Sequence, residues 1–147
     1  MRCSQAAVSA ECFSVIPISS RPSSSNWASG SCNRRWIARV APLVIEQGVG
    51  VSQRLADIYQ TKWPREKIRV DVSAYANAAG AYTTLDPLRV TISSTDPRNQ
   101  GDNAFDVLFY EASHGIAEPV QEAITRECRQ RSKAIPRDLW YALILYT

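Results

Sequence analysis

Histidine is almost missing from this chain of 147 residues, which contains only His114. A zinc site built on two histidines therefore cannot be assembled from one copy of the chain, and any imidazole catalysis must use His114.

Long apolar runs are missing too. None approaches the roughly 20 residues that a helix needs to cross a bilayer, so we expect no membrane span. The length fits one domain of roughly 100–200 residues.

The chain also lacks a broad excess of positive charge. Residues 1–40 contain five Arg and one Glu and so carry +4, whereas the whole chain carries +3. Residues 41–147 are therefore close to neutral, at −1. Nucleic-acid-binding domains usually present a basic surface, so we expect no nucleic-acid partner.

The cysteines do not have the spacing of a zinc knuckle, because no two are separated by two to four residues. Free thiols are the simpler interpretation. A disulfide framework stays open, and four cysteines would allow three pairings. The cysteines are Cys3, Cys12, Cys32 and Cys128.

Residues 1–35 differ in composition from the rest of the chain. Residues 19–25 read SSRPSSS, which has neither a helical nor a strand period. We therefore expect 1–35 to be disordered or foreign to the domain, and the domain to span 36–147. The apolar stretch near the start is interrupted by Glu11 and makes a poor signal peptide, which leaves a cytoplasmic and a secreted location open.

From residue 36 onward, apolar periodicity predicts an α+β domain. A small, mainly antiparallel or mixed sheet would pack against two amphipathic helices. The almost wholly apolar residues 139–146 have no polar or glycine terminator, which indicates a truncated C-terminus and predicts self-association through that helix. The expected helices are 37–60 (ended by Trp63-Pro64), 103–117, 119–132 and one beginning at 138, and the expected strands are 68–72, 81–84 and 88–93.

The sequence Tyr110-Glu111-Ala112-Ser113-His114 lies within the expected helix 103–117. Positions 110 and 114 are one turn apart, and 111 and 114 form an i, i+3 pair. This is the spacing of the H-E-x-x-H helix, in which two histidines bind zinc and the glutamate activates zinc-bound water. Taken alone, a Glu-x-x-His pair is more commonly structural, a buried histidine bonded to a glutamate.

Two segments, ISSTDPRNQG at 92–101 and LFYEASHG at 108–115, resemble bacterial proteins of the zincin-like metallopeptidase class. In that class a sheet strand precedes a helix reading L-F-H-E-A-S-H. The resemblance covers 36–147 and implies a zincin-like fold, a zinc cofactor and a peptide or protein substrate. It assigns His114 as a metal ligand, Glu111 as the general base and Tyr110 to the first ligand position. Strand 88–94 would hold the extended substrate by β-addition.

The class takes its third ligand from a later helix, for which Glu118, Glu122 and Tyr141 are candidates. A phenol with a pKa near 10 binds zinc poorly at pH 7 unless the metal drives its deprotonation. We therefore expect the scaffold of a zinc-dependent metallopeptidase-like hydrolase, impaired because the motif reads YEASH. The alternatives are a non-catalytic peptide-binding or structural relative and a truncated fragment without independent function.

Overall fold

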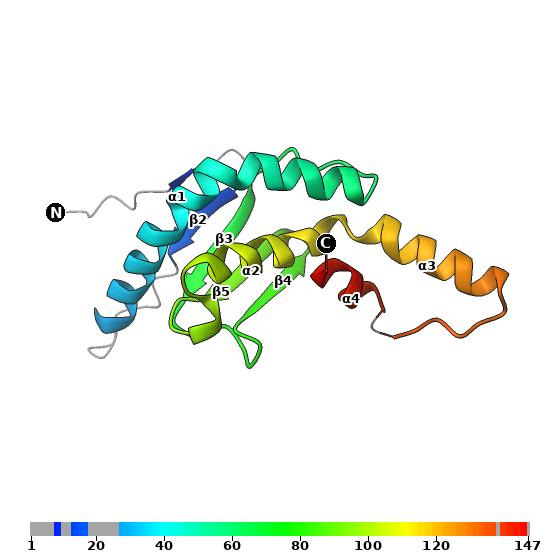
Figure 1. Ribbon diagram of the computed structural model, residues 1–147. Helices are drawn as coiled ribbons and strands as arrows, with labels where there is room; N and C mark the ends of the chain where they lie inside the picture. Colours follow the sequence, from blue (N-terminus) through cyan, green and yellow to red (C-terminus); the bar gives the residue numbers. More distant parts are fainter. Residues whose placement is uncertain (1–7, 10–12, 18–26, 138, 147) are drawn as a thin grey trace.

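The computed structural model describes residues 8–9, 13–17, 27–137 and 139–146, and it has the predicted α+β class (Figure 1). The strands are β1 (Val8–Ser9), β2 (Phe13–Pro17), β3 (Ile68–Ser73), β4 (Ala81–Leu85) and β5 (Leu88–Ser93). The helices are α1 (Trp27–Ile58), α2 (Asp102–Ser113), α3 (Glu118–Gln130) and α4 (Leu139–Leu145), with short 3-10 helices η1 (Pro97–Asn99) and η2 (His114–Ile116). No helix in the described ranges has the length and apolarity required to span a bilayer.

The sheet is mixed, with the strand order β1-β2-β3-β5-β4. Strand β3 pairs in parallel with β2 and β5, whereas β4 pairs antiparallel with β5. The prediction of 88–94 as the peptide-binding strand is wrong, because β5 is hydrogen-bonded on both sides. Strand β4 lies at an edge of the sheet instead and has no strand partner on its outer side among the described residues. Only such an edge can accept an added strand.

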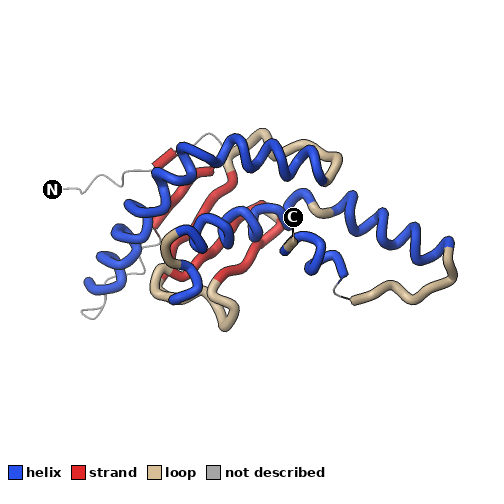
Figure 2. Tube along the Cα trace, viewed as in Figure 1, coloured by secondary structure: helices blue, strands red, loops and turns tan. Residues whose placement is uncertain are grey.

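Helices α1 and α2 both pack on one face of the sheet (Figure 2). Because side chains alternate along a strand, Val70 and Val90 point into this layer, while their neighbours Arg69 and Arg89 point to the other face. Both valines are fully buried, and ten or more apolar side chains from the two helices close the core. The apolar positions whose alternation predicted β3 and β5 therefore face the layer formed by α1 and α2.

Part of the N-terminal segment belongs to this fold, contrary to the expectation that 1–35 lies outside the domain. Strand β2 pairs with β3, and the Phe13 ring is fully buried, with its centroid 5.0 Å from that of Phe109 on α2. Helix α1 begins at Trp27 rather than at 37. Apart from β1, the remainder of the segment, including the serine-rich residues 19–25, Cys3 and Cys12, lies outside the described residues. Cys32 and Cys128 are free thiols.

The end of α1 differs from the predicted one. The helix stops at Ile58, several residues before Trp63-Pro64. Gln60 has a φ of 53°, and the Thr61 amide donates to the Ala56 carbonyl oxygen over 2.9 Å. This is the left-handed termination known as a Schellman motif, which satisfies the last carbonyl groups without proline.

A buried polar network fixes the loop between β5 and α2. The Asn99 side chain, 1% exposed, donates to the carbonyl oxygens of Gly80 (2.8 Å) and Ser93 (3.1 Å). Its backbone oxygen accepts a hydrogen bond from the Trp36 indole over 2.7 Å. Because this network joins α1, the β4 entry and the loop, it sets where α2 begins and so where the motif lies.

Candidate functional site

The YEASH motif occupies the C-terminal end of α2, where the helix tightens into η2 at His114. Directly after it, Gly115 lies against Leu88 of β5, so closely that an added Cβ would be 2.6 Å from a Leu88 methyl group. The glycine thus lets the end of α2 approach the sheet. The motif helix α2 lies beside strands β4 and β5.

Glu111 faces the edge strand β4. Its residue is 8% exposed, and the Thr83 hydroxyl lies 2.8 Å from its Oε2 and 2.7 Å from its backbone oxygen. The hydroxyl has one proton and donates it to one of these oxygens at a time. Burial raises the pKa of Glu111, and the Thr83 hydrogen bond lowers it by less.

His114 lies beside Glu111 but is not hydrogen-bonded to it, since Nε2 of His114 and Oε2 of Glu111 are 3.9 Å apart. Both side chains are 11% exposed. Burial lowers the pKa of His114, so the environment favours neutral imidazole over a charged ion pair with the carboxylate.

Three aromatic rings surround the imidazole. The ring centroids of Tyr110, Trp140 and Tyr141 lie 5.0, 5.4 and 5.5 Å from that of His114, each in an edge-to-face arrangement. Tyr110 comes from α2, and the other two come from α4, which contacts α2. Helix α4 therefore brings Tyr141, one of the candidates for the third ligand, next to the motif.

The phenol of Tyr110 has three charged or ionisable neighbours. Burial raises its pKa, and Glu111, Tyr141 and Tyr59 raise it further by electrostatic repulsion of the phenolate. The Tyr59 hydroxyl is buried and has no hydrogen-bond partner among the described residues. Side chains of α2 and α4 that carry oxygen or nitrogen atoms thus lie next to one another around His114.

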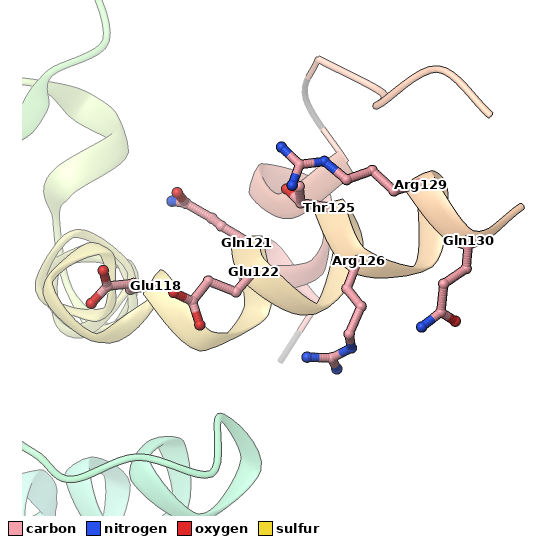
Figure 3. Close-up of a pocket in the computed structure, with 7 residues that line it drawn as sticks. All are labelled: Glu118, Gln121, Glu122, Thr125, Arg126, Arg129 and Gln130. Carbon is pink, nitrogen blue, oxygen red and sulfur yellow. The ribbon is translucent and has the colours of Figure 1, made fainter. Parts of the chain in front are cut away.

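The acidic candidates for a third ligand lie elsewhere. Glu118 and Glu122 line an open hollow of about 570 Å³ along α3, together with Arg126 and Arg129 (Figure 3). Helix α3 has no buried residue and extends away from the sheet (Figure 1). Within the described ranges no three His, Cys, Asp or Glu side chains form a metal-binding group, so neither glutamate joins Glu111 and His114.

The donors present do not fit a catalytic zinc site. Such a site normally has three protein ligands, chosen from imidazole, thiolate and carboxylate, and one open position. Here there is one imidazole and one carboxylate, and two further side chains beside the imidazole, Tyr110 and Tyr141, carry phenols. Phenols are poor zinc ligands while they are protonated.

Two residues of the site were not predicted as members of it. Thr83 has no signal in the sequence, because its contact with Glu111 depends on how β4 pairs with β5. Trp140 was not among the predicted site residues either, because its contact with His114 depends on the position of α4. Both contacts join segments far apart in the chain.

Comparisons with known proteins add no assignment. No family model matches the chain, and neither a curated protein nor a solved structure is significantly similar to it. The arrangement of α2, β4 and α4 is therefore the basis on which a function is proposed.

Proposed function

We propose that this chain has the scaffold of a zincin-like metallopeptidase whose hydrolytic site is impaired. One observation carries the proposal. The Glu-x-x-His pair of α2 lies against an antiparallel edge strand, with Glu111 linked to that strand by Thr83. A peptidase of this kind needs a general base and a metal ligand next to the strand that holds its substrate.

Strand β4 takes the substrate-binding role that the sequence had given to 88–94. Its outer edge has no strand partner among the described residues, and Tyr82 and Leu85 on it are 41% and 65% exposed. An extended peptide added there would bind through main-chain hydrogen bonds, and its side chains on the two faces of the sheet would contact Leu85 on one face and Tyr82 on the other. Its backbone would pass close to Thr83, and so to Glu111.

The impairment follows from the two tyrosines. Zinc bound by imidazole alone at His114 would lack two of the three protein ligands that hold a catalytic ion. We propose that Tyr110 and Tyr141 stand at these two positions, because both rings flank His114 from different helices. Glu111 then has no activated water to deprotonate.

The test is to restore imidazole at both positions. Zinc content after dialysis and cleavage of a quenched fluorescent peptide library would be measured for the native chain, Tyr110→His and Tyr110→His/Tyr141→His. We expect negligible zinc in the native chain, weak binding in the single variant and one zinc per chain in the double variant, accompanied by cleavage. Adding Glu111→Gln to the double variant should leave the zinc in place and abolish cleavage.

Tyr75→His is the matched control, since Tyr75 is 72% exposed and belongs to neither α2 nor α4. It should bind no more zinc than the native chain. If the double variant also bound no more zinc than this control, the proposed ligand positions would be wrong.

A second candidate function is peptide binding without catalysis. It is favoured by the closure of three rings around His114, while the edge of β4 stays exposed. Titrating the native chain with extended peptides, followed by amide chemical shifts, should then move β4 signals, and Leu85→Ala should weaken binding. Ile45→Ala, at a similarly exposed apolar site on α1, is the control. Non-cooperative thermal unfolding of the native chain would instead favour a fragment without independent function.

A further inference from the structure

Helix α4 and the segment before it present large apolar side chains to solvent. The inner side of α4 is buried, since Ile144 is 5% exposed and belongs to a core cluster. On the outer side, Leu139, Leu145 and Tyr146 are 40%, 65% and 89% exposed. Ile135, in the connection that leads to the helix, is 51% exposed. Apolar side chains that gather on a surface in this way mark a site for a protein or membrane partner.

The same part of the chain carries a concentration of positive charge. Helix α3, residues 131–137 and α4 form a hairpin that extends beyond the sheet (Figure 1). Residues 126–138 contain five Arg or Lys and two Asp or Glu and so carry +3, whereas the rest of residues 41–147 carries −4. The positive charge is thus segregated beside the exposed apolar helix. The five basic residues, all exposed, are Arg126, Arg129, Arg131, Lys133 and Arg137.

Most of these cations are available to an external partner. Arg131 is paired with Glu127 over 3.1 Å, at an exposed position where an ion pair contributes little. The other four have no ion pair among the residues that the structure describes. The acidic Glu118 and Glu122 lie in the first half of α3, before the basic residues (Figure 3). The hairpin therefore presents unneutralised positive charge together with apolar side chains.

This charge distinguishes between two occupants of the apolar surface. A symmetric dimer would pair the outer side of α4 with itself, so the basic segments of both copies would adjoin and repel each other. The surface of an anionic bilayer matches both features instead. Its headgroups attract Lys and Arg, and its headgroup boundary accepts leucine, isoleucine and tyrosine side chains.

We propose that the hairpin formed by α3, residues 131–137 and α4 binds the surface of an anionic membrane. Leu145 and Tyr146 enter the boundary between headgroups and acyl chains, while Lys133 and Arg137 contact lipid phosphate groups. Ile135 lies between these two cations in the sequence and adds apolar area to the contact. The hairpin lies on the bilayer and does not cross it. The inference goes beyond the proposed function, because it uses the outer side of α4 and not the side chains around the motif.

The test is cosedimentation of the native chain with vesicles of phosphatidylcholine, alone and mixed with phosphatidylglycerol. We expect strong binding to the mixed vesicles and little to the neutral ones, and salt should weaken the binding by screening. Lys133→Gln/Arg137→Gln should weaken binding by about 25-fold, at about fivefold for each charge. Leu145→Gln should weaken it by about tenfold, because an apolar side chain no longer enters the bilayer.

Two control variants match these changes at sites remote from α4, in the first half of α1 (Figure 1). Arg34→Gln/Arg39→Gln removes two exposed charges, and Ile45→Gln removes an apolar side chain that is 58% exposed. Both should leave binding nearly unchanged. All the substituted residues are exposed, so the fold should persist in each variant, which circular dichroism checks.

Three results would overturn the proposal. They are no binding to either kind of vesicle, equal binding to both kinds, and losses in the control variants as large as those in the hairpin variants. A stable dimer that forms without lipid, seen by sedimentation velocity and abolished by Leu145→Gln, would also overturn it, because a second copy of the chain would then cover the apolar surface.

Discussion

The Thr83 hydroxyl of β4 lies 2.8 Å from the Glu111 carboxylate of α2. This contact ties the free edge of the sheet to the motif helix through side chains 28 positions apart. It gives the carboxylate a donor in a place where burial would otherwise leave it unpaired. It also makes the placement of Glu111 depend on the pairing of β4 with β5.

Replacing Thr83 by Val should destabilise the fold and raise the pKa of Glu111 further, because the shape is kept while the hydroxyl is lost. The expected loss in the free energy of unfolding at pH 7 is about 1–3 kcal/mol, measured by urea denaturation. Thr84→Val, on the opposite face of the same strand, is the control and should change stability little. Equal losses in the two variants would contradict the role of the hydroxyl.

The stability of the chain should fall in mild acid because of His114. Burial holds its folded-state pKa below the ordinary 6.5. As pH falls through 6.5, the unfolded chain binds a proton that the folded chain does not, so the free energy of unfolding decreases until the folded-state pKa is reached. Urea unfolding from pH 7.5 downward should show a smaller decrease in the free energy of unfolding for His114→Gln than for the native chain. If the free energy of unfolding depended on pH equally in the two proteins, the imidazole would not be buried as described.

Glu111 should produce the opposite dependence. Burial raises its folded-state pKa above the ordinary 4.5. As pH rises through 4.5, the unfolded chain loses a proton that the folded chain keeps, so stability decreases until the raised pKa is passed. Glu111→Gln should lack this decrease, which the same unfolding series measures from pH 4 upward. A steeper decrease in the variant than in the native chain would contradict the assignment.

Two glycines should respond to alanine in opposite directions. Gly80 has a φ of +86°, and a Cβ there would collide with the Asp96 carboxylate, so Gly80→Ala should destabilise the chain by about 1–3 kcal/mol. Gly50 lies within α1 with open space around it, so Gly50→Ala should stabilise by about 0.5–1 kcal/mol. Thermal unfolding of both variants checks the pair. A destabilised Gly50→Ala would show that α1 is not helical at that position.

The buried amide of Asn99 should be sensitive to truncation. Asn99→Ala leaves the carbonyl oxygens of Gly80 and Ser93 without their side-chain donor, and a loss of about 2–3 kcal/mol is expected in denaturant unfolding. Gln100→Ala is a comparison at an exposed amide one residue later and should cost less. The reverse order would contradict the network's role in placing α2.

The elements predicted correctly are those with strong local patterns. Strand β5 has the expected bounds, and α2 is close to its expected range, because alternation and helical spacing directly reflect one buried face. Sequence spacing also placed Tyr110, Glu111 and His114 on one side of a helix, as found. These features depend only on residues that are close together in the sequence.

The features that were not predicted depend on distant pairing. Phe13 enters the core because β2 pairs with β3, which lies more than 50 residues later, and a low-complexity stretch between them obscured this. Strand β4 rather than 88–94 lies at the edge, because β5 also pairs with β3, about 20 residues earlier in the chain. Contact between Tyr141 and His114 required the path of the chain through α3 and α4.

The most direct test of the central claim, that Tyr110, His114 and Tyr141 surround one metal position, is zinc X-ray absorption spectroscopy of Tyr110→His/Tyr141→His. The account predicts three imidazole ligands at about 2.0–2.1 Å from a single zinc ion. A zinc ion with fewer than three imidazoles, or no stoichiometric zinc, would contradict it.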